Sequence, residues 1–315
     1  MSISESAQLK VVAAELRFAT VGDYFALLKP RVMSLVLFTG VAGLVIAPGS
    51  VHIGTALTAL LSIAVGAGAS AALNMAYDAD IDRLMSRTRL RPVPRGVIPA
   101  GEAAGLGATL SVGSVTVMGL FVNLVAAALL AFTIAFYVFV YTIWLKRLTP
   151  QNIVIGGLAG ALPPAIGWAS VTGGLDVAPL VLVAIIFLWT PPHFWALALF
   201  RTQDYARAGV PMLPVVRGKA ETRHQIVLYT VLVVLSGLLP AALGFAGPLF
   251  LAASIGTGLW FLVASIQVAF ERDEEREPGA RRLFGVSILY LFALFAALIV
   301  EQVAGIAPFA PLSTG

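Results

Sequence analysis

The chain has 315 residues, of which 59% are hydrophobic and only 11% are charged, with a formal net charge of +4. A water-soluble domain carries about a quarter charged residues, so this composition excludes an ordinary soluble protein and predicts an integral membrane protein. The sequence has no cysteine, which excludes disulfides, thiolate metal sites and covalent c-type haem attachment.

The first 30 residues lack a long apolar core and contain the acids Glu5, Glu15 and Asp23. This composition argues against a cleaved signal peptide and against an Arg-rich, acid-poor transit peptide. We interpret 1–30 as a cytoplasmic N-terminal segment.

Nine apolar stretches follow, each close to the roughly 20 residues that a bilayer-spanning helix needs. The predicted spans are 31–49, 54–77, 101–122, 125–145, 152–172, 177–200, 225–245, 248–270 and 283–305. They define an all-α transmembrane domain at 31–305 and a C-terminal tail at 306–315.

The basic residues test this assignment. If the N-terminus is cytoplasmic, all 20 Lys and Arg residues fall in the inner segments, and the opposite loops hold none. Such a bias is the signature of membrane orientation, so we predict nine helices with the N-terminus in the cytoplasm and the C-terminus outside. The basic balance then requires no nucleic-acid partner.

Two inner loops, 78–100 and 201–224, are much longer than the other connections, and long loops are commonly functional. The first begins within "NMAYDADIDRLMSRTRLRP" at 74–92, in which Asn74, Asp78 and Asp82 recur every four residues and therefore share one helix face.

Carboxylates at the electronegative C-terminal end of a helix are unfavourable without a cation. Mg²⁺ typically binds one or two carboxylates together with substrate phosphates. We therefore predict that Asn74, Asp78 and Asp82 hold Mg²⁺ and bridge a diphosphate. The alternative is a set of solvated acids paired with neighbouring arginines. We expect Asp80, on the other side, to cap the helix or face solvent.

Basic side chains near both loops are candidates for binding the phosphate oxygens, which arginine can contact through two nitrogens at once. Because inner loops carry positive charge for orientation as well, we expect only some of them to touch ligand. With one acid, Asp204, these candidates are Lys29, Arg31, Arg87, Arg91, Arg95, Lys146, Arg201 and Lys219.

The motifs resemble those of the UbiA-type intramembrane prenyltransferase superfamily. The Asn-x-x-x-Asp-x-x-x-Asp pattern with "RTRLRPVPRG" is similar to its first diphosphate motif. Three further stretches resemble motifs of the haem-modifying branch of this superfamily. They are "LLKPRV" at 27–32, "TPQNIVIGGLAGALPPAIGWASVTG" at 149–173 and "WTPPHFWALALFRTQDYARAGVPMLPVVRG" at 189–218. Many members carry a second Asp-x-x-x-Asp pattern, but here Asp204 is followed by Ala208, so a second Mg²⁺ site is incomplete.

The resemblance implies an enzyme, a UbiA-type bundle whose 31–305 domain is catalytic. It implies transfer of the farnesyl group of farnesyl diphosphate to the 2-vinyl group of haem b, with addition of water, giving haem O and diphosphate. Haem b is then a substrate and Mg²⁺ the cofactor. The implied location is the bacterial cytoplasmic membrane, with the site facing the cytoplasm. A haem A synthase or a terminal oxidase is a candidate partner.

His193, in "TPPHFW", lies about eight residues, or roughly 12 Å, inside the inner end of its span. A histidine inside a membrane is a functional candidate by default. Given the resemblance, it could ligate haem iron, orient a propionate or handle the proton of the added water. The alternative is a hydrogen-bonded packing residue.

Three other functions stay open at this point. A sibling prenyltransferase could act on a quinone or chlorin precursor. A cation-coupled transporter would place its acids near the bilayer midplane, whereas here they gather at one face. A haem-handling assembly factor without catalysis would not need the aspartate face.

Overall fold

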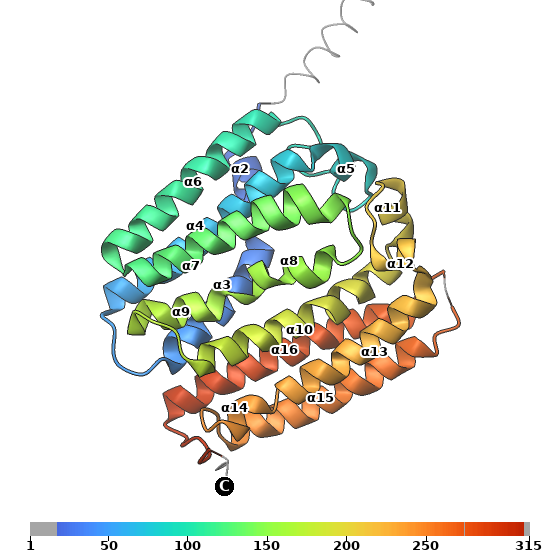
Figure 1. Ribbon diagram of the computed structural model, residues 1–315. Coiled ribbons are helices and arrows are strands. Elements are labelled where there is room, and N and C mark those ends of the chain that lie inside the picture. The colour runs from blue at the N-terminus through green and yellow to red at the C-terminus, as the bar shows by residue number, and fades with distance from the viewer. Residues whose placement is uncertain (1–17, 274, 312–315) are drawn as a thin grey trace, which may run out of the picture.

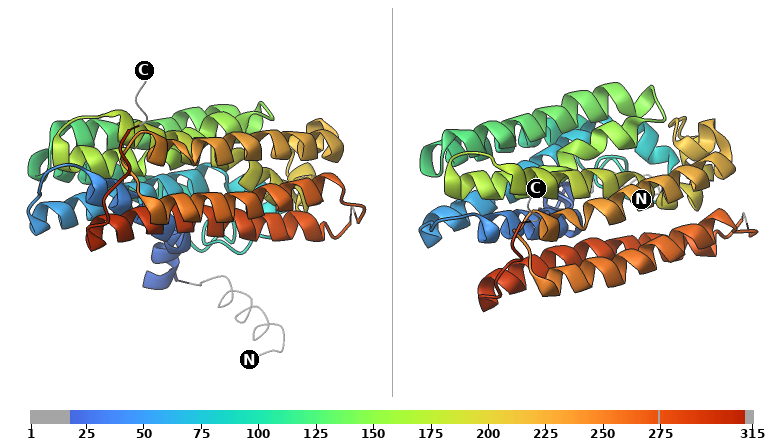
Figure 2. Two further views of the ribbon diagram at one scale, coloured as in Figure 1. Left: turned by 90° about the horizontal axis from the view of Figure 1, so that it is seen from below. Right: turned by 60° about the horizontal axis from the view of Figure 1, so that its bottom comes forward.

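The computed structural model describes residues 18–273 and 275–311. Every regular element within those ranges is a helix. The long helices lie side by side in one bundle (Figure 1), and two further views show that their axes stay roughly aligned throughout (Figure 2). Most of the expected cytoplasmic segment at 1–30 and the end of the tail at 306–315 lie outside the described residues.

Eight helical segments among the described residues are long and apolar enough to span a membrane. They comprise α4 (Ile53–Tyr77), α6 (Ala100–Phe121), α7 (Leu124–Ala135) continued by η1 (Phe136–Trp144) and η2 (Leu145–Arg147), α8 (Asn152–Ala161) with α9 (Pro163–Thr172), α10 (Val177–Leu199), α13 (Gly218–Ser236) with α14 (Leu239–Ala242), α15 (Pro248–Ala269) and α16 (Pro278–Ala304).

A ninth span exists only if two bent helices are counted as one. α2 (Val21–Leu27) and α3 (Pro30–Ile46) meet at an angle of 50°. The predicted span 31–49 extends three residues beyond the end of α3. The helix ends at Ile46, because Ala47 precedes a proline and takes the extended backbone that this position favours. The orientation of the termini stays a prediction.

The inner loops are more helical than expected. α13 begins at Gly218 rather than at 225, so the second loop is shorter than 201–224. It contains α11 (Thr202–Arg207) and α12 (Leu213–Val216), and the first loop contains α5 (Ala79–Leu84). A search for apolar residues misses polar helical turns, because Lys, Glu and Arg form helices well while lowering the hydropathy.

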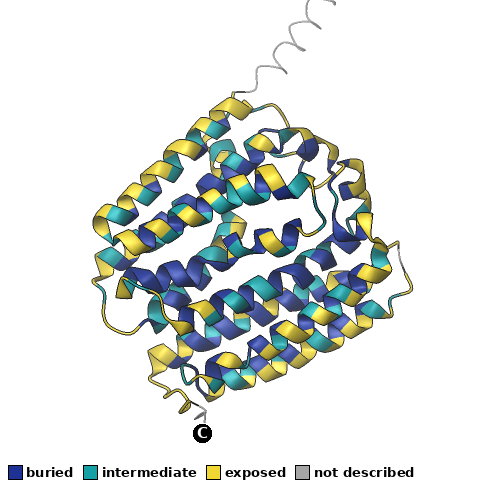
Figure 3. Ribbon diagram, in the orientation of Figure 1, coloured by how far each residue is buried: buried dark blue, intermediate teal, exposed yellow. Residues whose placement is uncertain are grey.

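Close backbone contact holds the bundle together. A Cβ on Gly43 of α3 would lie 2.0 Å from the carbonyl oxygen of Pro164, and one on Gly167 of α9 would lie 2.1 Å from that of Gly40. Figure 3 shows buried turns on the facing sides of the helices and exposed turns facing outward. Small residues permit such approach between helices in lipid.

The span 152–172 is bent, since α8 and α9 are separate helices that meet at Leu162, just before two prolines. Gly156 and Gly157 are close-packed against Tyr141 and Thr190. Gly160 faces open space instead.

The two long inner loops meet at one end of the bundle. α5, α11 and α12 lie there together, whereas α14 and the C-terminal end lie at the opposite end (Figure 1). A hydrophobic cluster joins the loops: Ile81 and Met85 from the first pack with Tyr205 and Met212 from the second. Both loops are therefore parts of one structure.

Candidate functional site

The predicted shared face of Asn74, Asp78 and Asp82 is present, although the helix is interrupted at Asp78. α4 ends at Tyr77 and α5 begins at Ala79, but the backbone bonds continue with helical spacing: Asp78 N donates to Asn74 O (2.9 Å) and Asp82 N to Asp78 O (2.8 Å). Asn74 is 4% exposed, Asp78 is 0% exposed and Asp82 is 2% exposed. Asp78 and Asp82 are therefore buried rather than solvated, although Asp82 does pair with a neighbouring arginine, Arg91.

Asp80 differs from its neighbours as expected. Its side chain is 63% exposed and accepts two hydrogen bonds from Arg147, both 2.8 Å long. The Arg147 guanidinium holds the pKa of this carboxyl below its usual range. Asp80 thus belongs to a surface ion pair.

Each of the three predicted ligand side chains accepts a hydrogen bond from one predicted basic residue. The pairs are Lys29 Nζ with Asn74 Oδ1 (2.9 Å), Lys146 Nζ with Asp78 Oδ2, and Arg91 Nη1 with Asp82 Oδ2 (2.7 Å). We call these six residues the aspartate cluster. Its two carboxylates face three cations, so a surplus of positive charge remains for an anionic ligand.

One buried carboxylate oxygen of the aspartate cluster lacks a hydrogen-bond donor. Asp78 Oδ2 accepts from Lys146 and from Asn74 Nδ2 (2.6 Å), but Asp78 Oδ1 is buried without a hydrogen-bond partner. Arg147 Nη2 lies 3.6 Å from it. An unsatisfied buried acceptor costs about 1–3 kcal/mol. A bound cation would satisfy this oxygen.

The donor set suits Mg²⁺. In the described part of the chain, no three His, Asp or Glu side chains gather where they could hold a metal. The cluster offers the oxygens of Asn74, Asp78 and Asp82 instead. Two carboxylates, completed by substrate phosphates and water, are a usual Mg²⁺ environment in proteins.

Lys29 reaches the cluster from the junction between α2 and α3. Its backbone has φ of 50°, a left-handed conformation that is uncommon outside glycine, and it precedes Pro30. Strained residues of this kind concentrate at functional sites. The bend between the two helices directs the Lys29 side chain to Asn74.

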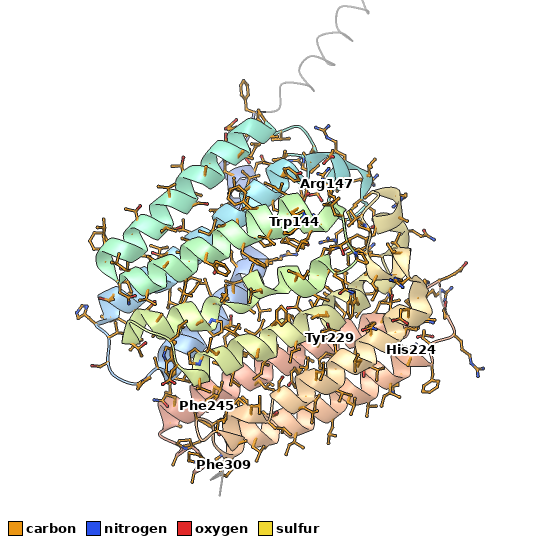
Figure 4. All side chains as sticks on the ribbon, viewed as in Figure 1. Trp144, Arg147, His224, Tyr229, Phe245 and Phe309 are labelled. Carbon is orange, nitrogen blue, oxygen red and sulfur yellow. The ribbon has the colours of Figure 1, made fainter. Side chains whose placement is uncertain are left out.

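Sequence reasoning missed Thr142, whose Oγ1 accepts from Asn74 Nδ2 at 3.2 Å. Thr142 lies in η1, a π-helical stretch. Such stretches are often found at functional sites, but "FYVFVYTIW" carries no recognisable signal for one. Trp144, the last residue of this stretch, and Arg147 lie at the same end of the bundle (Figure 4).

Some predicted phosphate-binding residues do not join the aspartate cluster. Arg31 and Arg87 are exposed. Arg95 Nη2 instead lies 2.8 Å from Asp23 Oδ1, near the start of α2. Of the first-loop and helix-end candidates, the structure brings only Lys29, Arg91 and Lys146 to the aspartates.

The second-loop candidates line a cavity of about 610 Å³. Arg201, Asp204 and Lys219 all border it, and none of the three predicted metal ligands does. Lys219 Nζ also lies 3.0 Å from Glu277, a buried carboxylate at the start of α16. We call this space the basic cavity.

Asp204 connects the two loops. Its carboxylate is buried and accepts from Ser86 Oγ (2.6 Å), from Ser86 N (3.3 Å) and from Arg207. Burial opposes ionisation, but these hydrogen bonds outweigh it and keep the pKa of Asp204 below its usual range. Asp204 therefore remains charged at neutral pH and ties the first loop to α11.

Replacing Asp204 with alanine is expected to loosen the first loop. Amide hydrogen exchange in 86–98 should rise about tenfold, because each lost charged hydrogen bond contributes roughly 1.5–3 kcal/mol. The folded pKa of Asp204 is lowered, so its stabilisation is present above about pH 4 and is lost as the pH falls through that lowered pKa.

The matched control is Asp273→Ala, which removes an exposed acid from another inner connection. Exchange in 86–98 should stay unchanged in this variant. Equal exchange in wild type and Asp204→Ala at pH 7 would contradict the tie between the loops.

His193 is not part of the aspartate cluster. It lies in α10, is 7% exposed and packs against α16, where its Nδ1 lies 2.7 Å from Ser287 Oγ. Trp189 and Phe284 stack on its two faces. Apart from Arg31, Arg87 and Arg95, the structure therefore places the predicted site residues in three groups, namely the aspartate cluster, the basic cavity and an aromatic site around His193.

A bundle of membrane-length helices, with buried carboxylates and basic side chains side by side at one end, defines an integral membrane protein. The model of the UbiA prenyltransferase family matches residues 36–289, and the chain therefore belongs to that family. It is accordingly a prenyltransferase of the membrane-embedded type.

Relatives and solved structures agree with this assignment. The chain is 59% identical over 285 residues to a protein from Parvibaculum lavamentivorans, with 90% of each chain covered, and 60% identical over 287 residues to one from Nitrobacter hamburgensis, covering 91% and 92%. Both relatives are named protoheme IX farnesyltransferase.

The fold resembles that of a digeranylgeranylglyceryl phosphate synthase, with a TM-score of 0.72, 20% identity and coverage of 89% of this chain and 98% of that one. It also resembles a UbiA homologue from Archaeoglobus fulgidus bound to DMAPP and Mg²⁺, with a TM-score of 0.65, 18% identity and coverage of 88% and 99%. At these identities the likeness supports the fold alone.

Proposed function

We propose that this protein transfers the farnesyl group of farnesyl diphosphate to the 2-vinyl group of haem b, with addition of water, and releases haem O and diphosphate. The observation that carries the proposal is 59–60% identity, across nine-tenths of the chain, to proteins named protoheme IX farnesyltransferase. The buried aspartate cluster supplies the chemistry that such a reaction needs.

Asn74, Asp78 and Asp82 would hold Mg²⁺, and the unsatisfied Asp78 Oδ1 supports this role. Bound there, Mg²⁺ would neutralise charge on the diphosphate. Lys29 and Lys146 then exchange their contacts with the ligand side chains for contacts with phosphate oxygens.

Arg91 serves the same purpose beside Asp82, with two nitrogens available to one phosphate group. The reaction breaks the bond between farnesyl C1 and oxygen, and the electron pair leaves with diphosphate. Cations fixed in a buried site stabilise that charge without reorganising during the step.

The farnesyl group, as an allylic cation, takes the electron pair of the vinyl group. A new carbon–carbon bond forms, and water adds to the other vinyl carbon with loss of a proton. The apolar walls of the bundle exclude bulk water from the cation until the carbon–carbon bond has formed.

We also propose the orientation in which the aspartate cluster and the basic cavity face the cytoplasm, in the bacterial cytoplasmic membrane. The confinement of all 20 basic residues to the inner segments supports it. Residues 31–305 form the catalytic domain in this proposal, and the segments between α4 and α6 and between α10 and α13 form its cytoplasmic loops. A haem A synthase or a terminal oxidase would receive the product.

Purified protein incubated with haem b, farnesyl diphosphate and Mg²⁺ should yield haem O, identified by its mass. Chelation of Mg²⁺ should stop product formation, and its return should restore it. Unchanged haem in the complete mixture would overturn the proposed substrate. A prenylated quinone precursor formed in its place would identify a sibling activity in the same family.

A further inference from the structure

The short helix α2 is anchored to the rest of the bundle through an apolar side chain. It lies beside α4 and α6 (Figure 1), and Leu27 is fully buried in a cluster with Met75 of α4 and Ala103 of α6. This contact holds α2 close to the bundle. A single apolar contact leaves the helix free to rotate about it, so polar contacts are needed to set its direction.

Asp23 makes the first of these polar contacts. Its Oδ2 accepts from the backbone N of Thr20 (3.0 Å) and from the Thr20 hydroxyl (2.7 Å), as part of a capping box at the start of α2. Its Oδ1 accepts from Arg95 Nη2 at 2.8 Å. One carboxylate therefore closes the end of α2 and also joins this helix to the first inner loop.

Tyr24 makes the second polar contact. Its hydroxyl donates to Glu102 Oε1, in the first turn of α6. Consecutive residues point about 100° apart around a helix, so Asp23 and Tyr24 reach two different elements. Together with Leu27, they fix both the position and the rotation of α2. We call Asp23, Tyr24, Arg95 and Glu102 the α2 brace.

The backbone of Lys29 connects α2 to the aspartate cluster. Lys29 N donates to Ala26 O in α2 (3.3 Å), and Lys29 O accepts from Val32 N in α3 (2.9 Å). Its φ of 50° and ψ of 60° are left-handed, whereas a residue before proline favours an extended backbone. A disfavoured conformation of this kind persists only where the surrounding structure imposes it. Release of α2 would let Lys29 relax and withdraw its Nζ from Asn74.

The α2 brace also joins two cations of the aspartate cluster. Arg95 N donates to Arg91 O at 3.0 Å, in the turn that carries Arg91 to Asp82. The ion pair between Asp23 and Arg95 thus links the segment that holds Lys29 to the segment that holds Arg91. It fixes the spacing of two groups that bind one diphosphate in the proposed function.

We propose that the α2 brace positions Lys29 for the diphosphate, and that its four members are positioning residues that do not touch the substrate. The inference rests on the proposed function, which gives Lys29 its phosphate contacts. It assigns Arg95 a role different from the phosphate contact expected from the sequence. Farnesyl diphosphate then binds only molecules in which Lys29 is in place, so its apparent affinity falls with the fraction of such molecules.

Arg95→Gln and Asp23→Asn each break the ion pair of the α2 brace. Each should raise the KM for farnesyl diphosphate about three- to fivefold, because a partly exposed ion pair contributes modestly. The kcat and the KM for haem b should stay near wild type, since saturating farnesyl diphosphate selects the molecules with Lys29 in place. The double variant should match either single variant, because both remove the same contact.

Tyr24→Phe removes the other polar anchor of α2. Combined with Arg95→Gln, it should raise the KM for farnesyl diphosphate about tenfold, because contacts to different elements act independently. The matched control is Arg89→Gln, which removes an exposed arginine from the same loop as Arg95 and should leave this KM unchanged.

Two comparisons separate positioning from direct phosphate binding by Arg95. If Arg95 were a phosphate ligand, Asp23→Asn would release it, and the KM for farnesyl diphosphate would stay constant or fall. In a Lys29→Met background, Arg95→Gln should add no further effect if it acts through Lys29, whereas independent phosphate contacts would multiply. A constant or lower KM in Asp23→Asn, or multiplied effects with Lys29→Met, would overturn the proposal.

Chemical labelling of lysine measures the position of Lys29 without any substrate. Lys29 Nζ is held against Asn74, so it should react slowly with acetic anhydride, as read by mass spectrometry of its peptide. Arg95→Gln should raise the labelling rate of Lys29 about three- to fivefold and leave that of Lys146 unchanged. General loosening of the fold would raise both rates, and no change at Lys29 would overturn the proposal.

The outcomes separate the inference from the proposed function. If wild type forms haem O while Arg95→Gln changes neither the KM for farnesyl diphosphate nor the labelling of Lys29, the α2 brace is wrong and the proposed function stands. If the labelling of Lys29 rises as expected but wild type does not bind farnesyl diphosphate, the α2 brace holds Lys29 and the proposed function is wrong, together with the diphosphate role of Lys29.

Discussion

Replacing Asp78 with asparagine is expected to lower haem O formation by at least about 100- to 1,000-fold, the usual effect of losing one charge-stabilising group from an active site. Asparagine keeps the size of the side chain and an oxygen that can accept from Lys146. It removes the negative charge that the buried, unsatisfied Oδ1 offers to a cation. The measurement is the initial rate of product formation at saturating substrates.

The matched control is Asp80→Asn, two residues further along the chain. Asp80 is largely exposed and pairs with Arg147 at the surface, so this variant should retain most of the wild-type rate. A surface ion pair contributes only about 0–1 kcal/mol, so its stability should also be close to that of wild type. Comparing the two separates a site effect from a general effect of removing acid from this segment.

The Mg²⁺ dependence decides what Asp78 does. If Asp78 helps to hold the metal, Asp78→Asn should need much more Mg²⁺ than wild type for any residual rate. A variant that keeps the wild-type rate and Mg²⁺ requirement would move the metal site elsewhere. A residual rate far below that of wild type, with an unchanged Mg²⁺ requirement, would make Asp78 a partner of Lys146 only.

The sequence was sufficient to predict the shared face of the three acid and amide residues in the aspartate cluster, because that prediction depends on local geometry. Asn74, Asp78 and Asp82 are four residues apart, and helical hydrogen bonds carry that spacing through the break at Asp78. Charge bias likewise predicted that Lys29 and Lys146 would lie at the same end of the bundle. Helical periodicity and membrane orientation can both be inferred from the order of residues in the sequence.

Contacts between distant segments could not be predicted in this way. Ser86 and Asp204 are 118 residues apart, and nothing in either loop indicates the other. The partner of Lys219 is Glu277, at a helix start that hydropathy does not mark. Thr142 points at Asn74 because of a π-helical turn, which one sequence does not reveal.

The sequence also could not predict which arginines of the inner loops contact the aspartates. An inner loop collects positive charge for orientation as well as for binding, so composition cannot rank its members. Only packing distinguishes Arg91, which reaches Asp82, from Arg95, which pairs with Asp23. Three-dimensional contacts are therefore needed to choose among residues of one type.

Replacing Gly43 with alanine is expected to have the largest effect on folding. The added Cβ would lie 2.0 Å from the carbonyl oxygen of Pro164 and 2.6 Å from its carbonyl carbon. Both are backbone atoms, so no side-chain rotation relieves the clash, and α3 must move away from α9. Overpacking typically costs about 1–3 kcal/mol, and a clash with backbone should reach or exceed the upper end.

The displacement should reach the aspartate cluster as well. α3 begins directly after Lys29, whose Nζ donates to Asn74, so a shift of this helix withdraws a cation from the site. Gly43→Ala should therefore lower the thermal stability of the purified protein in detergent. It should also lower the rate of haem O formation per molecule of folded protein.

Gly160→Ala provides the control on the neighbouring helix α8. A Cβ at Gly160 meets nothing within 4 Å, and alanine favours a helix over glycine by about 1 kcal/mol, so this variant should be as stable as wild type or more so. If Gly43→Ala matched Gly160→Ala in stability and rate, the close approach of α3 to α9 could not be what holds Lys29 against the aspartate cluster. A loss confined to Gly43→Ala would tie the packing of small residues in the bundle directly to the charge arrangement at its end.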